Sequence, residues 1–193
     1  MNLIDEHAVR AQKLRITRSP DPIAGTISVW LDTALGRGPV EAAIAGATSR
    51  QAGYLVLESV PLANTSQRAR PGERTPGIQT VALIERKRGM DYEAWREQWQ
   101  GQHTRVGIET QSTFQYIQNV VFRRLHEDAP PWAAIVEEGF PAEAVTDPMV
   151  FYAADGSEQR LRENRRRMME SCAKFIDFDS LESHPLSEYV LLR

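Results

Sequence analysis

Two indole side chains and one imidazole recur at four-residue intervals in the segment WREQWQGQH, as Trp95, Trp99 and His103. Residues four apart lie on one side of an α-helix, drifting by about 40° per step. Imidazole gains or loses a proton near neutral pH, which suits it to general acid–base catalysis. We predict that Trp95 and Trp99 line a ligand cavity and that His103, at the end of this wall, is catalytic. A histidine that is simply favoured near the C-terminal end of its helix is the alternative.

A second set of polar side chains lies in the segment FQYIQNVVFRRL, which has the residue types of a β-strand. Alternate residues of a strand point to opposite faces, so Tyr116 and Gln118 share one face and Asn119 lies on the other. Polar residues among apolar neighbours are informative, because buried polar groups need hydrogen-bond partners. Tyr116 and Asn119 are candidates for catalysis, and Gln118 is a candidate for ligand binding. For Tyr116 the alternative is ordinary core packing with a bonded hydroxyl group.

Two carboxylates and another histidine complete the candidates. Asp177 and Glu137 have apolar neighbours in the sequence, and burial in an apolar pocket raises the pKa of a carboxyl group until it becomes a usable acid or base. We assign Asp177 to catalysis and Glu137 to ligand binding, since only one of Glu137 and Glu138 can face inward from a strand. His184 precedes a proline and could bind a ligand at the mouth of a pocket. The alternatives are that Asp177 ties a loop and that His184 lies in a surface loop.

Several kinds of site are missing from the sequence. It has no glycine-rich phosphate loop, no G-x-S-x-G nucleophile elbow and no closely spaced Cys or His pair for a metal ion. We therefore expect no metal and no cofactor. The single cysteine, Cys172, is expected in the core, where no neighbouring base would activate it. A net charge of −3 argues against a nucleic-acid partner, and the basic stretch from Arg160 is interpreted as a solvated helix face.

The N-terminal residues are too polar for a signal peptide, and no apolar run has the length of a membrane span. A lone cysteine fits a reducing compartment. The expected location is the cytoplasm, without a membrane partner.

Hydrophobic patterning predicts the elements that position these residues. In the second half of the chain the expected order is β-α-β-β-α-β, the split βαβ arrangement of ferredoxin-like units. Asp91 is a plausible N-cap for the first of the two helices. The predicted strands span residues 78–88, 114–125, 132–140 and 186–192, and the predicted helices span residues 92–103 and 157–175.

The first half of the chain repeats this order in part. Its predicted elements are a lead helix at residues 3–12, a hairpin of two strands at 13–19 and 26–34, a helix at 38–49 and a strand at 53–62. We predict that residues 1–63 form a shortened ferredoxin-like half, residues 64–77 a linker and residues 78–193 a complete half. Each antiparallel sheet would leave one face bare, and two such sheets packed together would enclose a barrel. The predicted fold is therefore α+β, a dimeric α/β barrel in tandem form.

The aromatic, Trp and His positions on one helix, followed by a Tyr-x-x-Asn strand, resemble the EthD family of small bacterial proteins. The chain end, with Phe175 and Asp177 in a Phe-x-Asp element, also resembles the closing helix and strand of that family. The likeness extends over residues 78–193 and implies a ferredoxin-like unit that pairs through its sheets into a barrel. The matching helix and strand positions are Trp95, Trp99, His103, Tyr116 and Asn119.

This resemblance and the Trp–Trp–His wall together predict a cofactor-free enzyme of small-molecule catabolism or biosynthesis, such as a cofactor-independent monooxygenase or a lyase. It would oxygenate, dehydrate or isomerise an aromatic or carbonyl compound in a barrel cavity, with His103 transferring the proton. A non-catalytic small-ligand-binding or accessory protein with the same barrel is the alternative, and a structural dimer with a filled barrel is a third reading. A homodimer is expected, because the shortened first half leaves apolar sheet surface uncovered.

Overall fold

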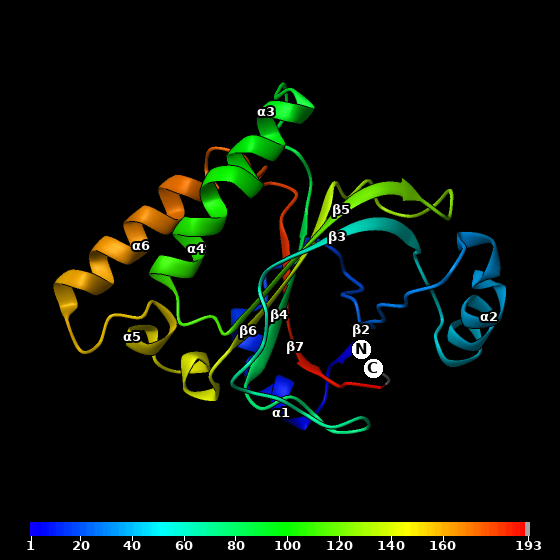
Figure 1. Ribbon diagram of the computed structural model, residues 1–193, viewed down its shortest axis with the longest axis horizontal. Coiled ribbons are helices and arrows are strands. Elements are labelled where there is room, and N and C mark those ends of the chain that lie inside the picture. Colours follow the sequence, from blue (N-terminus) through cyan, green and yellow to red (C-terminus); the bar gives the residue numbers. More distant parts are fainter. Residues whose placement is uncertain (192–193) are drawn as a thin grey trace.

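The computed structural model describes residues 1–191 and contains one curled antiparallel sheet of seven strands (Figure 1). The strand order is β2-β1-β7-β4-β6-β5-β3. The predicted α+β class with antiparallel strands is confirmed. The strands are β1 (Asn2–Leu3), β2 (Gly25–Thr26), β3 (Tyr54–Leu62), β4 (Ile78–Ile84), β5 (Gln115–Arg124), β6 (Ala134–Phe140) and β7 (Glu182–Glu188).

Helical segments alternate with these strands in the predicted order from β4 onward. The Asp91 side chain accepts hydrogen bonds from the backbone N–H groups of Glu93 and Ala94, so the predicted N-cap is confirmed. The helix that follows runs well past His103. The α-helices are α1 (Glu6–Val9), α2 (Gly38–Ala47), α3 (Tyr92–Arg96), α4 (Thr104–Thr110), α5 (Pro148–Phe151) and α6 (Glu158–Cys172), with a π-helix η3 (Glu97–His103) and 3₁₀ turns η1 (Gln12–Leu14), η2 (Ala34–Arg37) and η4 (Ala142–Val145).

The main core lies between the sheet and the layer formed by α3, η3, α4 and α6 (Figure 1). Fully burying one large apolar side chain stabilises a fold by roughly 1.5–3 kcal/mol, so this cluster is a main source of its stability. The Trp95 indole N–H also donates to the backbone carbonyl of Phe175, at 3.1 Å, which ties the helix to the end of α6. The buried members are Ile84, Trp95, Trp99, Tyr116, Val120, Ala134, Val136, Phe175 and Ile176.

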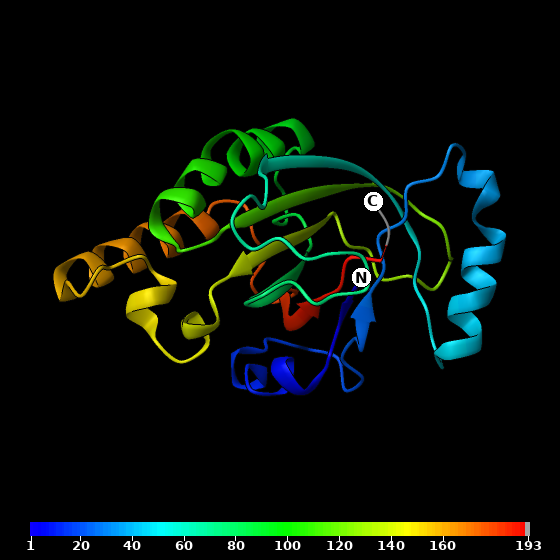
Figure 2. The ribbon, with the colours of Figure 1, turned by 60° about the horizontal axis from the view of Figure 1, so that its bottom comes forward.

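The other face of the sheet is concave and carries a smaller apolar cluster, formed by Val81, Leu83 and Leu186 with Ile4 and Ile23 packed against it. Helix α2 lies beyond this side of the sheet, far from α4 and α6 (Figures 1 and 2), and none of its residues is buried. The two faces of the sheet are therefore covered unequally, with the thick helical layer on one side only.

Several sequence predictions, in the first half of the chain and for the last strand, need correction. The expected strand at residues 26–34 is wrong, because only β2 pairs there, with β1. Ile27, Val29 and Trp30 are 43%, 45% and 72% exposed, since no strand of residues 1–191 lies beside them. The lead helix shortens to α1 and η1 and follows a strand. The expected strand at residues 13–19 is wrong, because within the described part of the chain a single bridge between Ile16 and Ser183 is all that pairs there. The last strand begins at Glu182 rather than at residue 186, and residue 192 lies outside the described part.

The remaining predictions for the first half, a helix at residues 38–49 and a strand at residues 53–62, are confirmed as α2 and β3. Strand β3 pairs with β5, and β1 pairs with β7, so strands from the first half extend the sheet at both edges.

Within residues 1–191, no helix combines the length and the apolar character that crossing a bilayer requires.

Candidate functional site

The candidate residues named from the sequence lie on both faces of the sheet. Tyr116 belongs to the helix-covered core, and the Gln118 amide donates to the Thr104 hydroxyl on the same side, at 2.8 Å. Asn119 points the other way and donates to Glu137, at 3.2 Å. The alternation predicted for this strand is thus confirmed. Trp95, Trp99, His103, Tyr116 and Gln118 lie on the helix-covered face, and Asn119, Glu137 and His184 lie on the concave face.

The predicted barrel cavity would lie against the concave face of the sheet. His103 does not point to that face, so its predicted position in the cavity is wrong. It lies in the helix layer, 7% exposed, beyond the buried indoles of Trp95 and Trp99, whose ring centroids are 5.0 Å apart. This stripe is the most apolar side of the helix. The hydrophobic effect therefore packs this stripe against α6 and against the helix-covered face of the sheet, which is opposite its concave face.

The helix widens into the π-helix η3 where it carries Trp99 and His103. The Thr104 backbone N–H donates to the Trp99 carbonyl, five residues back. The Thr104 hydroxyl donates to the Gln100 carbonyl at 2.9 Å and accepts from Gln118. Gln118, predicted to bind a ligand, thus makes a hydrogen bond to Thr104, the residue at which the π-helix ends. Short π-helical insertions are rare and occur frequently at functional sites.

His103 forms one hydrogen bond to α6 and one ring contact with the turn that follows α6. Its Nδ1 lies 2.9 Å from Ser171 Oγ, and its ring centroid lies 4.7 Å from that of Phe175. Burial lowers the pKa of His103 from 6.5 to about 4, so the imidazole is neutral at pH 7. A neutral imidazole carries one N–H, and either the ring or the hydroxyl group can be the donor in this pair.

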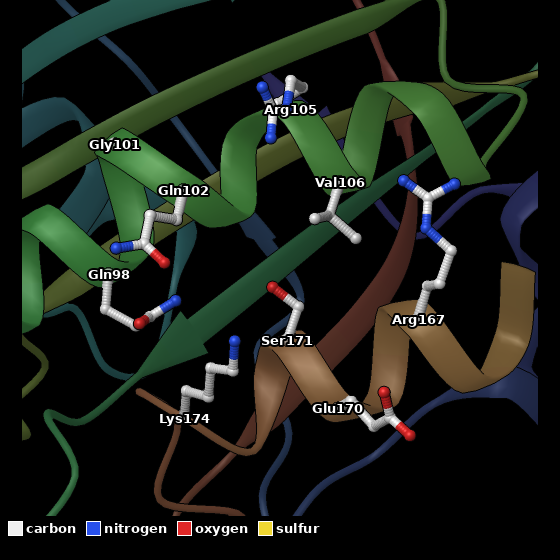
Figure 3. Close-up of a pocket in the computed structure, with 9 residues that line it drawn as sticks. All are labelled: Gln98, Gly101, Gln102, Arg105, Val106, Arg167, Glu170, Ser171 and Lys174. Atoms are coloured by element: carbon white, nitrogen blue, oxygen red, sulfur yellow. The ribbon is translucent and has the colours of Figure 1, made fainter.

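Ser171 also lines a groove of about 450 Å³ between the helix that carries His103 and α6 (Figure 3). This volume falls in the range of small-molecule sites, roughly 300–1,000 Å³. The hydroxyl group of Ser171 therefore lies between this groove and a buried imidazole. The lining residues are Gln98, Gly101, Gln102, Arg105, Val106, Arg167, Glu170, Ser171 and Lys174.

On the concave face, Glu137 is held by two amide groups. Asn2 Nδ2 donates to its Oε2 at 2.9 Å, and Asn119 Nδ2 donates to its Oε1. Burial and the nearby carboxylate of Glu188 raise the pKa of Glu137, against the lowering effect of these donors. Asn119 and Glu137 are thus brought together as neighbours, while His103 and Tyr116 lie across the sheet from them.

His184 is fully buried in β7, so the alternative that it lies in a surface loop is wrong. Its Nε2 lies 2.8 Å from Glu182 Oε2 on the same face, two residues back. Burial lowers the pKa of His184, and the Glu182 carboxylate partly offsets this. Strand β7 continues through Pro185 because that residue is paired on one side only, with Thr80 of β4, so the missing N–H breaks no ladder bond.

Glu138 points to the helix-covered face, opposite Tyr116 on the neighbouring strand. No side-chain hydrogen bond to Glu138 is found within residues 1–191. Burial raises the pKa of its carboxyl group to about 7 and also raises the pKa of the Tyr116 phenol. Cys172 packs against the same core, where burial raises the pKa of its thiol to about 12, as expected for an unreactive cysteine.

Asp177 ties the turn after α6. Its Oδ1 accepts from the backbone N–H of Asp179 at 3.1 Å, and its Oδ2 lies 3.5 Å from Arg88 Nε. These contacts match the loop-tying alternative.

Ser171 is the residue that sequence reasoning missed. In the sequence it stands between Met168 and Phe175, at helical spacing on the buried side of α6. A polar residue in an otherwise apolar stripe needs a partner, and that signal could have directed attention to it.

No protein-family model matches the chain, and no curated protein has a significantly similar sequence. The EthD resemblance therefore stays a prediction.

Proposed function

We propose that this chain is an enzyme of small-molecule metabolism that works without a bound cofactor, and that its site is the groove beside His103. The observation that carries the proposal is the 2.9 Å contact between His103 Nδ1 and Ser171 Oγ, with Ser171 in the groove wall. A hydroxyl group between a ligand and an imidazole can pass a proton from one to the other. The proposed substrate is an aromatic or carbonyl compound.

Isomerisation or dehydration of a carbonyl compound suits this pair best. Ser171 Oγ would take a proton from the substrate while giving its own proton to His103 Nδ1, and the reverse transfer would return a proton at a second position. Because burial lowers the pKa of His103 to about 4, the imidazolium formed in this way returns its proton readily. Oxygenation would additionally require O₂ and a substrate that reacts with O₂ on its own.

The second candidate is a non-catalytic protein that binds a small ligand in the same groove. The low pKa of His103 favours it, because a general base is most effective when its pKa lies near the working pH. The groove would then bind a ligand without turning it over.

Turnover of a panel of aromatic and carbonyl compounds, followed by proton NMR, separates the two candidates. We expect His103→Asn and Ser171→Ala each to lower turnover by about 100-fold or more, the usual contribution of a positioned acid or base. His7→Asn, at an exposed position, is the matched control and should retain activity. Turnover that survives both substitutions would place the chemistry elsewhere, and binding without turnover of any compound would favour the ligand-binding protein.

We also propose that residues 78–191 are a ferredoxin-like unit related to the EthD family and that the chain forms a homodimer. The β-α-β-β-α-β order and the bare side of the sheet support this. Trp30, Leu35, Leu57 and Phe122 are 72%, 88%, 61% and 70% exposed, and large apolar groups on a surface commonly mark an interface. Light scattering should give twice the chain mass of 21.8 kDa. A monomer at micromolar concentration would overturn the proposed dimer.

A further inference from the structure

Positively charged side chains outnumber negatively charged ones around the groove, and one of the positive side chains has no partner in the described part of the chain. Glu109 lies 2.5 Å from Arg167 Nη2 and 3.7 Å from Arg105 Nε, so these two guanidinium groups share one carboxylate. Glu170 is bound by Arg166 on its own helix. The remaining cation is the exposed side chain of Lys174, whose Nζ has no hydrogen bond or ion pair within residues 1–191. A protein with a net charge of −3 thus presents a positive groove.

A second donor without an acceptor lies at the same end of the groove. The amide nitrogen of Gln98 is buried and has no hydrogen-bond partner among the described residues. Figure 3 shows the Gln98 amide, from η3, and the Lys174 amine, from the turn after α6, directed into the groove from opposite sides, with the Ser171 hydroxyl beside them. Since an unpaired buried N–H costs free energy, a ligand that brings an acceptor gains by pairing with it.

We propose that this end of the groove binds the carboxylate of a small organic acid, held by Lys174 Nζ and the Gln98 amide. The inference rests on the proposed function and names its substrate class: a carbonyl or aromatic compound that carries a carboxylate. The carboxylate would lie at the end formed by Lys174 and Gln98. The rest of the molecule would extend along Gly101 and Val106, and its reactive carbon would face Ser171 Oγ. The ion pair fixes orientation, and Ser171 with His103 supplies the proton transfer.

Benzoate and its neutral isostere benzamide are suitable probes, because they differ only in the group that Lys174 and Gln98 would recognise. Each is titrated into the full-length protein while the backbone amide resonances are followed by NMR. We expect benzoate to shift the resonances of residues 98–106 and 167–174 and to bind about tenfold more tightly than benzamide, since a charge-assisted hydrogen bond is roughly twice as strong as a neutral one.

Two variants and a matched control assign the effect. Lys174→Met should weaken benzoate about tenfold and leave benzamide unchanged, and Gln98→Leu should weaken benzoate less. Lys13→Met removes an exposed lysine from η1, away from the groove, and should change neither affinity. Equal affinity for both probes, or benzoate affinity unaffected by Lys174→Met, overturns the carboxylate inference but leaves the groove as a ligand site. Shifts confined to the concave face, for instance at Asn119 and Glu137, overturn both the inference and the proposed function.

Discussion

Replacing His103 by Asn removes a titrating ring from the helix layer and keeps a hydrogen-bonding group near Ser171. In the folded protein burial lowers the pKa of His103 from 6.5 to about 4. As the pH falls, the unfolded chain therefore binds this proton first. The stability that comes from keeping the ring neutral is fully present above pH 6.5 and is lost as the pH falls towards 4. At about 1.4 kcal/mol per pKa unit, the loss amounts to about 3 kcal/mol.

Urea unfolding of the wild type and of His103→Asn, between about pH 7 and about pH 4, isolates this contribution. The comparison with the variant is needed because the raised pKa values of Glu137 and Glu138 act in the opposite direction, stabilising the fold as the pH falls. The wild type should lose about 3 kcal/mol relative to the variant over this range. The reasoning would be refuted if the difference in the free energy of unfolding between wild type and variant stayed constant with pH. An NMR titration that places the His103 ring near its ordinary pKa would refute it as well.

Three further predictions concern the helix-covered core and the turn that follows α6. Trp99→Ala should lower the free energy of unfolding by about 3–5 kcal/mol, because it empties a fully buried site, and a loss below about 1 kcal/mol in urea unfolding would contradict the packing. Glu138→Gln should stabilise the protein by about 3 kcal/mol above pH 7, where the wild-type carboxylate is charged, and give no gain below pH 4.5; equal effects at both ends of this range would contradict the raised pKa. Asp177→Asn should cost about 1 kcal/mol or less and leave benzoate binding unchanged, whereas loss of binding would assign Asp177 to the site.

Local sequence signals predicted the parts of the fold that depend on neighbours in the chain. The Asp91 cap, the helical stripe of Trp95 and Trp99 and the opposite directions of Gln118 and Asn119 follow from the helix and strand periods alone. The sequence predicted the helices, but it did not predict which face of the sheet they cover. Periodicity shows that one face of a helix is buried, and it does not show which element packs against that face.

Tertiary contacts account for what the sequence could not predict. Ser171 meets His103 only because α6 lies against η3, and the two residues are far apart in the chain. His184 is buried because β7 starts before the His–Pro pair, at a place where β4 pairs with it on one side and Ile16 bridges Ser183 on the other. The apolar residues after β2 resembled a strand by composition, yet the partner that a strand requires is missing from residues 1–191.

The central claim is that a small ligand binds beside His103 and Ser171, on the helix side of the sheet. A carboxylated nitroxide radical tests it most directly, because an unpaired electron broadens the NMR resonances of nuclei close to it wherever the probe binds. The account predicts selective broadening of the backbone amides at residues 98–106 and 167–174, reversed by excess benzoate. Broadening centred on Asn119, Glu137 and His184 would place the ligand on the concave face and contradict the account.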